Sequence, residues 1–390
     1  MSAFDPRYIE PCSTGELDRR HRTVRAAMER EGFDALLLYN YDNFLGGYTR
    51  YLTDNPVAEY PTCVVFYRED DLSYIVHGAP DVPSRPDYCM RRVTAPLGLP
   101  FMTTLHYTDS LIPQLVCEDL RRHGVKRLGL IARQMLPVSL VEGIHAALPQ
   151  VEQLDATDLL DRIKAVKSEE EIAGLRKIAH THDILAAAVP SVFRPGRTDY
   201  EIQCDLKHIA AELGCYGLNI QLGSDPIHPK MNPPGMYGRR VEDGDCIFIL
   251  LEVSGPGGLY GEIARVWSLG RLDEALVRAV DSCFAAQDWI AAQVRPGADP
   301  AELYRLNNEF LAERGYGAEK RLFAHGQGYD MVERPAFVPA ERMKLEENMF
   351  LAIHPGASNG VFAVNGCDNY LVTATGCERL THLHRGVILV

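Results

Sequence analysis

Six polar side chains in the second half of the sequence stand beside strand-like apolar runs. They are Glu252, Glu262, His325, His354, Cys367 and Asp368. Carboxylates and imidazoles are the usual general acids and bases of enzymes, because burial and neighbouring charges move their pKa values. The same side chains bind borderline metal ions such as Zn²⁺, Mn²⁺ or Fe²⁺. Together the six residues predict a polar reaction site.

Strands are the elements that must position these residues. The uninterrupted apolar run Cys246–Leu251 is typical of a strand buried on both faces, and Glu252 follows it directly. Glu262 opens an alternating segment, and His354 closes the apolar run Met349–Ile353. We therefore expect neighbouring strands of one sheet to bring the polar residues together at the strand ends.

An internal repeat runs through the second half of the chain. Arg194-Pro-Gly196 recurs as Arg295-Pro-Gly297, at an offset of 101 residues. The same offset relates Glu201 to Glu302 and Gly214 to Gly315. Each copy predicts a loop, a helix and a terminal glycine. We interpret the repeat as a duplicated helix–strand unit with pseudo-twofold symmetry, and long helices beside an antiparallel sheet predict an α+β domain with its site between the copies.

The first half has a different pattern. A helical spacing of apolar residues ends at Gly32, and two strand-like runs, Cys63–Tyr67 and Ser73–His77, predict a hairpin. These features predict an α/β domain over residues 1–160. Ser168 with Glu171 forms a capping-box pattern at the start of a long helix, so the second domain is expected over residues 163–390.

Composition limits the classes of partner. The 390 residues carry 40 Lys and Arg against 53 Asp and Glu, a net charge of −13, which disfavours binding to nucleic acid or to an anionic membrane surface. Ten cysteines without Cys-x-x-Cys spacing, and an N-terminus without signal-peptide character, predict a cytoplasmic location.

Several of these segments resemble the pita-bread family of creatinase, aminopeptidase P, prolidase and methionine aminopeptidase. Leu259-Tyr-Gly-Glu-Ile-Ala-Arg265 resembles its Gly-Tyr-x-x-Asp-Ile-Thr-Arg segment. His325-Gly-Gln-Gly328, with Glu333-Arg-Pro335, resembles its His-Gly-Ile-Gly and His-Glu-x-Pro run. The resemblance implies a creatinase-type N-terminal α/β domain, an α+β pita-bread catalytic domain, a small-molecule substrate and a homodimer.

The metal positions of the family are altered in this sequence. The resemblance implies two Asp, one His and two Glu as ligands of two metals. The first Asp position falls on Leu251 or Glu252, and the second falls on Glu262. The His position is kept as His325, and the first Glu position holds His354. The second Glu position falls on Cys367, with Asp368 next to it. A second His of the peptidase motif is replaced by Val332. A full two-metal site is therefore not expected.

Two site arrangements follow. In the first, no metal is bound, and His228, Glu252, Glu262, His325 and His354 form an acid–base pocket that activates water against a C–N carbon. In the second, a single divalent Zn, Mn or Fe ion is held by Glu262, His325 and His354, with Asp368 or Cys367 as a fourth ligand.

Other residues receive supporting roles. Glu333 is expected to orient the catalytic groups. Residues expected to contact substrate are Tyr260, Arg265, Gln327, Cys367 and Asp368. For Arg265, structural pairing with Glu262 is the alternative. His228 stands where creatinase and its relatives carry a catalytic histidine, with a surface loop histidine as the alternative.

The leading functional hypothesis is a hydrolase of a C–N bond in a small polar nitrogen-containing molecule, similar in logic to creatinase or ectoine hydrolase. The first alternative is a metal-dependent Xaa-Pro dipeptidase or aminopeptidase. Further alternatives are a lyase on the same scaffold and a non-catalytic peptide-binding module.

Overall fold

The computed structural model describes residues 5–40, 44–45, 47–56, 60–79, 87–102, 104–232, 236–270, 273–360 and 363–390. The chain divides into two compact units. The first comprises Pro11–Lys164, and the second comprises Ala165–Val390 together with the N-terminal segment that ends at Glu10. Among the described residues, no helix combines the length and the apolar character that crossing a membrane requires.

The unit Pro11–Lys164 is an α/β domain built on one six-stranded mixed sheet of order β4-β3-β2-β1-β5-β6. Its strands are β1 (Ala35–Asn40), β2 (Thr62–Tyr67), β3 (Leu72–His77), β4 (Val93–Leu99), β5 (Arg127–Leu130) and β6 (Glu152–Asp155). Its helices are α1 (Thr14–Glu31), α2 (Gly47–Thr53), α3 (Leu111–Arg122), α4 (Val138–Ala147) and α5 (Thr157–Ala165), with 3₁₀ turns at Asp87–Met90, His106–Thr108 and Arg133–Met135.

Local sequence signals account for much of this unit. Helix α1 begins after Ser13, whose hydroxyl accepts the backbone N–H of Glu16, and it ends at Gly32 with φ 75°. The predicted hairpin is the antiparallel pair β2–β3. Apolar residues of β1, β2 and β5 pack against α3 and α4 to form the core.

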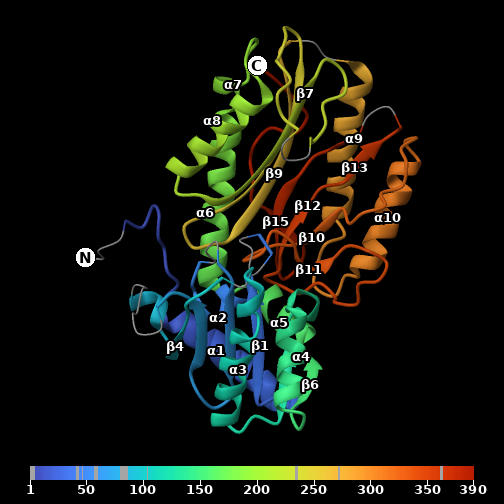
Figure 1. Ribbon diagram of the computed structural model, residues 1–390. Coiled ribbons are helices and arrows are strands. Elements are labelled where there is room, and N and C mark those ends of the chain that lie inside the picture. The colour runs from blue at the N-terminus through green and yellow to red at the C-terminus, as the bar shows by residue number, and fades with distance from the viewer. Residues whose placement is uncertain are drawn as a thin grey trace. The chain divides into compact units, whose positions relative to one another are not determined.

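The second unit is an α+β domain in which helices flank two connected sheets (Figure 1). Its helices are α6 (Glu169–Ala187), α7 (Val189–Val192), α8 (Asp199–Glu212), α9 (Glu274–Ala291) and α10 (Pro300–Ala312). Its strands are β7 (Tyr216–Asp225), β8 (Cys246–Ser254), β9 (Tyr260–Ser268), β10 (Ala324–Gly326), β11 (Glu333–Ala336), β12 (Phe350–Ile353), β13 (Gly356–Ser358), β14 (Ala363–Asn365), β15 (Asp368–Val372), β16 (Cys377–Arg379) and β17 (Val387–Leu389).

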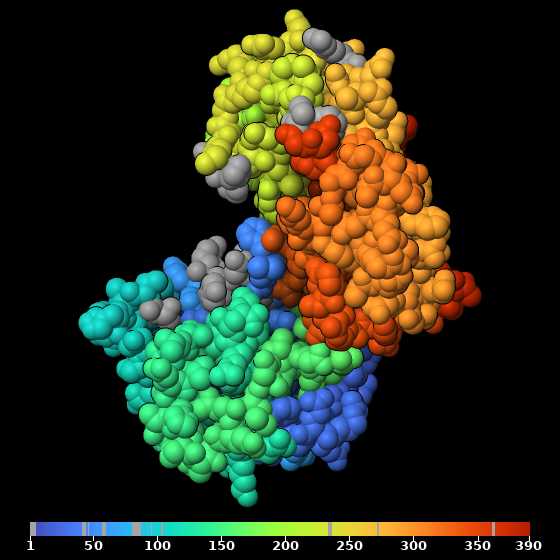
Figure 2. Space-filling model, turned by 90° about the vertical axis from the view of Figure 1, so that its right-hand side faces the viewer, coloured from blue at the N-terminus to red at the C-terminus, as the bar shows by residue number. Residues whose placement is uncertain are grey.

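The sheets have the orders β17-β9-β8-β7 and β11-β10-β12-β15-β16, with β13 and β14 forming a separate pair. A bridge between Ala264 and Cys367 connects the two larger sheets. The pairs are antiparallel except β17 with β9, which is parallel. In Figure 1, α6 and α8 lie to the left of the strands, and α9 and α10 lie to the right. Figure 2 presents the outer surface of α10, in orange.

The duplication predicted from the sequence is present in the fold. Helices α8 and α10 occupy the two copies, and their N-caps, Thr198 and Asp299, are again 101 residues apart. The repeated glycines have matching backbone geometry, with φ 85° at Gly196 and Gly297 and φ 81° at Gly214 and Gly315. The predicted capping box of α6 is formed by Ser168 and Glu171. The predicted fold class is confirmed.

One expectation about the strands was wrong. Glu252 and Glu262 lie inside β8 and β9 and not at their ends, because the strands continue to Ser254 and begin at Tyr260. The short strands β16 and β17, which follow β15, were not predicted from the sequence. A three-residue strand has too few residues to show a periodic pattern.

A buried ion pair between Arg265 and Asp368 connects β9 to β15. The Nη2–Oδ1 distance is 2.6 Å, and neither side chain is exposed. Arg265 also donates to the carbonyl oxygens of Cys367 and His384. The pair therefore ties the strand that carries Glu262 to two segments that follow it in the chain.

We predict that Asp368→Asn lowers the free energy of unfolding of the metal-free protein by about 3–5 kcal/mol, because it leaves a buried guanidinium without its counter-charge. Urea denaturation at pH 7 measures this change. The control is Glu378→Gln, which breaks the half-exposed pair of Glu378 with Arg176 and should cost less than about 1 kcal/mol. Equal losses in the two variants would contradict the prediction.

Candidate active site

Two carboxylates lie side by side at the centre of the pita-bread domain. The β8–β9 register pairs Glu252 directly with Glu262, and pairs Leu251 with Ile263. Because successive side chains of a strand point to opposite faces, Glu252 shares the face of Glu262 and Leu251 does not. Of the two residues considered for the first Asp position, the register therefore favours Glu252.

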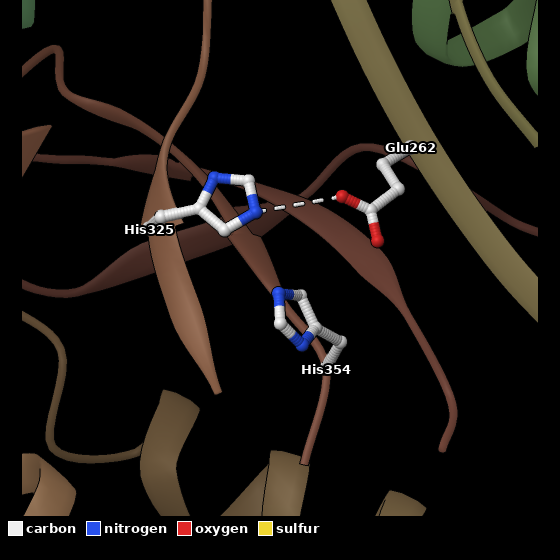
Figure 3. Close-up of side chains that lie close together, drawn as sticks. All are labelled: Glu262, His325 and His354. Carbon is white, nitrogen blue, oxygen red and sulfur yellow. Dashed lines mark ion pairs between the residues drawn. The ribbon is translucent and has the colours of Figure 1, made fainter. Parts of the chain in front are cut away.

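Glu262, His325 and His354 form a compact buried group (Figure 3). Glu262 comes from β9, His325 from β10, and His354 directly follows β12. One potential ligand atom from each residue lies within 4.8 Å of the other two. The His325 Nε2–Glu262 Oε2 distance is 3.6 Å, and the two imidazole centroids are 5.2 Å apart. The fold thus brings together three residues that the sequence separates by up to 92 positions.

The two carboxylates differ in charge. Burial raises the pKa of Glu252 well above its usual value, and the neighbouring Glu262 charge raises it further, which favours the protonated form of Glu252. Burial would also raise the pKa of Glu262, but the adjacent imidazoles of His325 and His354 lower it to about 2. Glu262 is therefore the ionised member of the pair.

The two histidines are held in different ways. His325 Nδ1 lies 2.8 Å from the carbonyl oxygen of Gly326, an acceptor that fixes the proton on Nδ1 and leaves Nε2 facing Glu262. Burial lowers the pKa of His354 to about 4 despite the opposing charge of Glu262, so this imidazole is neutral at pH 7. His354 Nδ1 is buried without a hydrogen-bond partner among the described residues.

A chain of side-chain amides runs from the carboxyl group of Glu252 to the backbone of Glu262. Asn219 Nδ2 donates to Glu252 Oε2 at 2.8 Å, and Gln327 Nε2 donates to Glu252 Oε1 at 3.1 Å. Asn369 Nδ2 donates to Gln327 Oε1 at 3.1 Å, and its Oδ1 accepts the backbone N–H of Glu262 at 2.8 Å. This chain fixes the position of both glutamates.

Sequence reasoning missed Asn219 and Asn369. The available signal for Asn219 was the alternation of Asn219 and Gln221 with apolar residues along one strand. Gln327, which was expected to contact substrate, instead connects Glu252 to Asn369.

The donor set of the three-residue group fits a divalent cation. Two imidazole nitrogens and one carboxylate oxygen are the protein ligands of many catalytic Zn²⁺ and Fe²⁺ sites, which keep further positions open. Ligand atoms roughly 2.1 Å from a shared ion lie about 3–3.5 Å apart. The 3.6 Å separation of His325 Nε2 and Glu262 Oε2 is close to that spacing.

Asp368 and Arg265 are not part of this group. Asp368 Oδ1 accepts hydrogen bonds from Arg265 at 2.6 Å and from the Thr381 hydroxyl at 2.7 Å, and Asp368, expected as a fourth metal ligand, is not among the residues that the fold gathers around Glu262. Arg265 is fully buried in these contacts and is not available to a substrate carboxylate. Its ionic partner is Asp368 and not the Glu262 considered from the sequence.

Cys367 and Tyr260 adjoin the group without joining it. The Cys367 sulfur lies 3.9 Å from the Glu262 carbonyl oxygen, and burial raises the pKa of this thiol well above its usual value. Tyr260 is buried, and its hydroxyl occupies the space that a Cβ atom on residue 217, a glycine, would need.

Glu333 and His228 lie in other surroundings. Glu333 forms a buried ion pair with Lys167 at 2.6 Å. The backbone N–H of His228 donates to Asp225, which pairs with Cys246 at the other end of β8 from Glu252. The six-residue separation corresponds to roughly 20 Å along a strand. The described chain therefore does not bring His228 to the three-residue group.

Sequence comparison identifies the family. Residues 173–374, more than half of the chain, match the model of metallopeptidase family M24, and residues 20–166 match the creatinase/prolidase N-terminal domain. The chain belongs to metallopeptidase family M24. The suspected family is confirmed, and M24 membership implies a hydrolase of C–N bonds.

Relatives of this M24 protein include peptidases. It is 27% identical over 261 residues to the probable dipeptidase PepE of Mycobacterium tuberculosis, a match that covers 62% of this chain and 67% of PepE. It is 25% identical over 276 residues to the Xaa-Pro dipeptidase of Pyrococcus horikoshii, covering 68% of this chain and 76% of that protein.

Solved structures show the same fold. The X-Pro aminopeptidase of Thermotoga maritima aligns with a TM-score of 0.79 and 19% identity, covering 95% of this chain and 99% of that one. Dipeptidase PepE of Mycobacterium ulcerans aligns with a TM-score of 0.78 and 20% identity, covering 98% and 100%.

We predict that His354 gives the metal-free protein a pH-dependent instability. Its pKa is about 4 in the folded state and 6.5 when unperturbed, so between these values the unfolded chain binds more protons and stability falls as pH falls. Relative to His354→Gln, the wild type should lose roughly 2–3 kcal/mol between pH 6.5 and pH 4 and nothing between pH 8 and pH 7. Urea denaturation of both proteins across this range measures the difference, and a difference that does not change with pH would refute the assignment.

Proposed function

We propose that this chain is a metal-dependent hydrolase that cleaves the peptide C–N bond of a dipeptide, with Xaa-Pro dipeptides as the first class to test. The observation that carries the proposal is the buried group of Glu262, His325 and His354, whose potential ligand atoms lie within 4.8 Å of one another. The dipeptidases among the relatives support a dipeptide substrate. This proposal replaces the metal-free hydrolase as the leading hypothesis.

The three residues have the protonation states that a divalent cation requires. Glu262 is ionised and His354 is neutral at pH 7, so both can offer a lone pair. His325 presents Nε2 because Nδ1 faces the Gly326 carbonyl oxygen. When bound, the ion would supply a Lewis acid for the substrate carbonyl and lower the pKa of a water molecule.

Glu252 would act as the proton donor. It is the protonated carboxyl of the pair, and it lies directly across the strands from Glu262. Amide cleavage requires a proton on the leaving nitrogen, and a carboxyl with a raised pKa still holds its proton at pH 7. The amides of Asn219 and Gln327 would keep Glu252 in place while the proton moves.

A single ion is proposed because the positions that would complete a second site hold other chemistry. Cys367 stands at the second Glu position, and its buried thiol has a raised pKa, so it does not supply an anion at neutral pH. Asp368 beside it is engaged by Arg265. Of the two glutamates, only Glu262 is ionised.

A second candidate function is the metal-free hydrolysis of a small polar nitrogen-containing molecule. The observation that favours it is that Glu252 and Glu262 already differ in protonation, while His325 lies 3.6 Å from Glu262. An acid, a base and a histidine are sufficient for water activation without an ion.

We predict that the wild type purified without chelators contains close to one Zn, Mn or Fe ion per chain, measured by elemental analysis. Glu262→Gln and His325→Ala should weaken metal binding by more than roughly a hundredfold, because loss of a ligand costs at least as much as loss of its hydrogen-bond partner. Glu212→Gln, which alters an exposed carboxylate on α8, is the matched control and should bind like the wild type.

We predict that the loaded wild type hydrolyses Ala-Pro, that Glu262→Gln lowers kcat/KM by more than roughly a hundredfold, and that Glu212→Gln leaves kcat/KM unchanged. Full activity in protein shown to be metal-free would exclude the metal-dependent mechanism and favour the second candidate. A metal-loaded protein that cleaves no dipeptide would exclude the proposed substrate class.

A further inference from the structure

We propose that a pocket lined by α9 and by the segment 379–385 binds a free amino acid as a zwitterion. The pocket has a volume of about 530 Å³, within the range of roughly 300–1,000 Å³ that is typical of small-molecule sites. None of its lining residues belongs to the group of Glu262, His325 and His354. The pocket is therefore a second binding site, separate from the one at which we propose hydrolysis.

The pocket presents charges of both signs. Arg379 and Arg385 contribute two guanidiniums, and Asp281 and Asp288 contribute two carboxylates. With two charges of each sign, the lining favours neither a polyanion nor a polycation. A free amino acid carries one carboxylate and one ammonium at pH 7, so it can pair with both kinds of group.

Two of these charges have no close partner in the described part of the chain. Asp281 forms no ion pair or hydrogen bond there. Arg379 forms one ion pair, in which its Nη1 lies 3.8 Å from Asp368 Oδ2, and that nitrogen has no hydrogen-bond partner among the described residues. Arg385 and Asp288 instead pair with each other at 2.6 Å. Arg379 and Asp281 are therefore the groups that a carboxylate and an ammonium would engage.

The part of the lining around Leu383 and His384 is held in place before any ligand binds. The buried guanidinium of Arg265 donates to the carbonyl oxygen of His384 at 2.8 Å and to that of Leu383 at 3.4 Å. The Asp183 carboxylate accepts the backbone N–H groups of His382 and Leu383 at 2.9 Å and 3.0 Å. A wall that is already ordered lowers the entropic cost of binding a small ligand.

Apolar surface in the pocket favours one class of amino acid. Phe284, Ala285 and Leu383 belong to the lining. An aliphatic side chain placed against them is removed from water, which favours binding. Leucine combines an aliphatic side chain with the two charges, so L-leucine is the ligand to test.

Isothermal titration calorimetry compares L-leucine with N-acetyl-L-leucine, which lacks the ammonium, and with L-leucinamide, which lacks the carboxylate. The wild type should bind L-leucine at least roughly tenfold more tightly than either derivative, the lower limit expected for hydrogen bonds to a charged group. Arg379→Gln and Asp281→Asn should each weaken the binding of L-leucine by roughly ten- to a hundredfold, because each removes one of the two charges that the zwitterion engages.

Two control variants should bind L-leucine like the wild type. Arg305→Gln removes a half-exposed arginine of α10 that does not line the pocket. His325→Ala changes the candidate active site and leaves the pocket intact. Loss of binding in His325→Ala but not in Arg379→Gln would place the amino acid at the candidate active site and overturn the proposal.

Equal binding of L-leucine and N-acetyl-L-leucine would indicate a simple anion site and refute the recognition of a zwitterion. No saturable binding to the wild type, or full binding in both Arg379→Gln and Asp281→Asn, would refute the site itself. None of these measurements requires catalysis. A protein that binds L-leucine through Arg379 but hydrolyses no dipeptide would contradict the proposed function and leave this site standing.

Discussion

The cross-strand pair of Glu252 and Glu262 is the constraint on which the rest of the site depends. Two carboxylates that are 6% and 5% exposed cannot both be ionised without a compensating positive charge. The surroundings favour the protonated form of Glu252, and two imidazoles lie beside Glu262. The same imbalance makes the centre of the domain suitable for a cation, because a divalent ion would compensate the negative charge where it is concentrated.

The surroundings of the pair hold it in place at several levels. Amides of Asn219, Gln327 and Asn369 satisfy the polar atoms that burial would otherwise leave unpaired. The Arg265–Asp368 pair secures the backbone around Cys367, on the strand that bridges to β9. These contacts are contributed by both halves of the duplicated domain. The reactive groups are therefore positioned by long-range packing between the copies.

Membership of family M24 and the altered ligand positions carry different information. The family match covers residues 173–374 and accounts for the scaffold and for C–N hydrolysis. His354 and Cys367, at positions where the resemblance implies glutamates, put a neutral imidazole and a thiol of raised pKa in place of two carboxylates. A neutral imidazole remains a good ligand for a borderline metal, whereas a buried protonated thiol does not. The site thus keeps enough ligands for one ion, but fewer than the two-metal site that the resemblance implies.

The sequence by itself indicated the fold class, the duplication, and Glu262, His325 and His354 as candidate site residues. Apolar periodicity, glycine positions and motif spacing can be recognised in the sequence alone, because each depends on residues close together in the chain. Only the tertiary structure decided that Glu252, not Leu251, faces Glu262, since a one-residue change of register reverses the face of a strand. It also decided that Asp368 belongs to Arg265 and that His228 lies at the far end of the strand. Two charges neutralise each other only when they lie close together in space. These charges come from segments far apart in the chain, and the spacing of residues along the sequence does not give the distances between such segments.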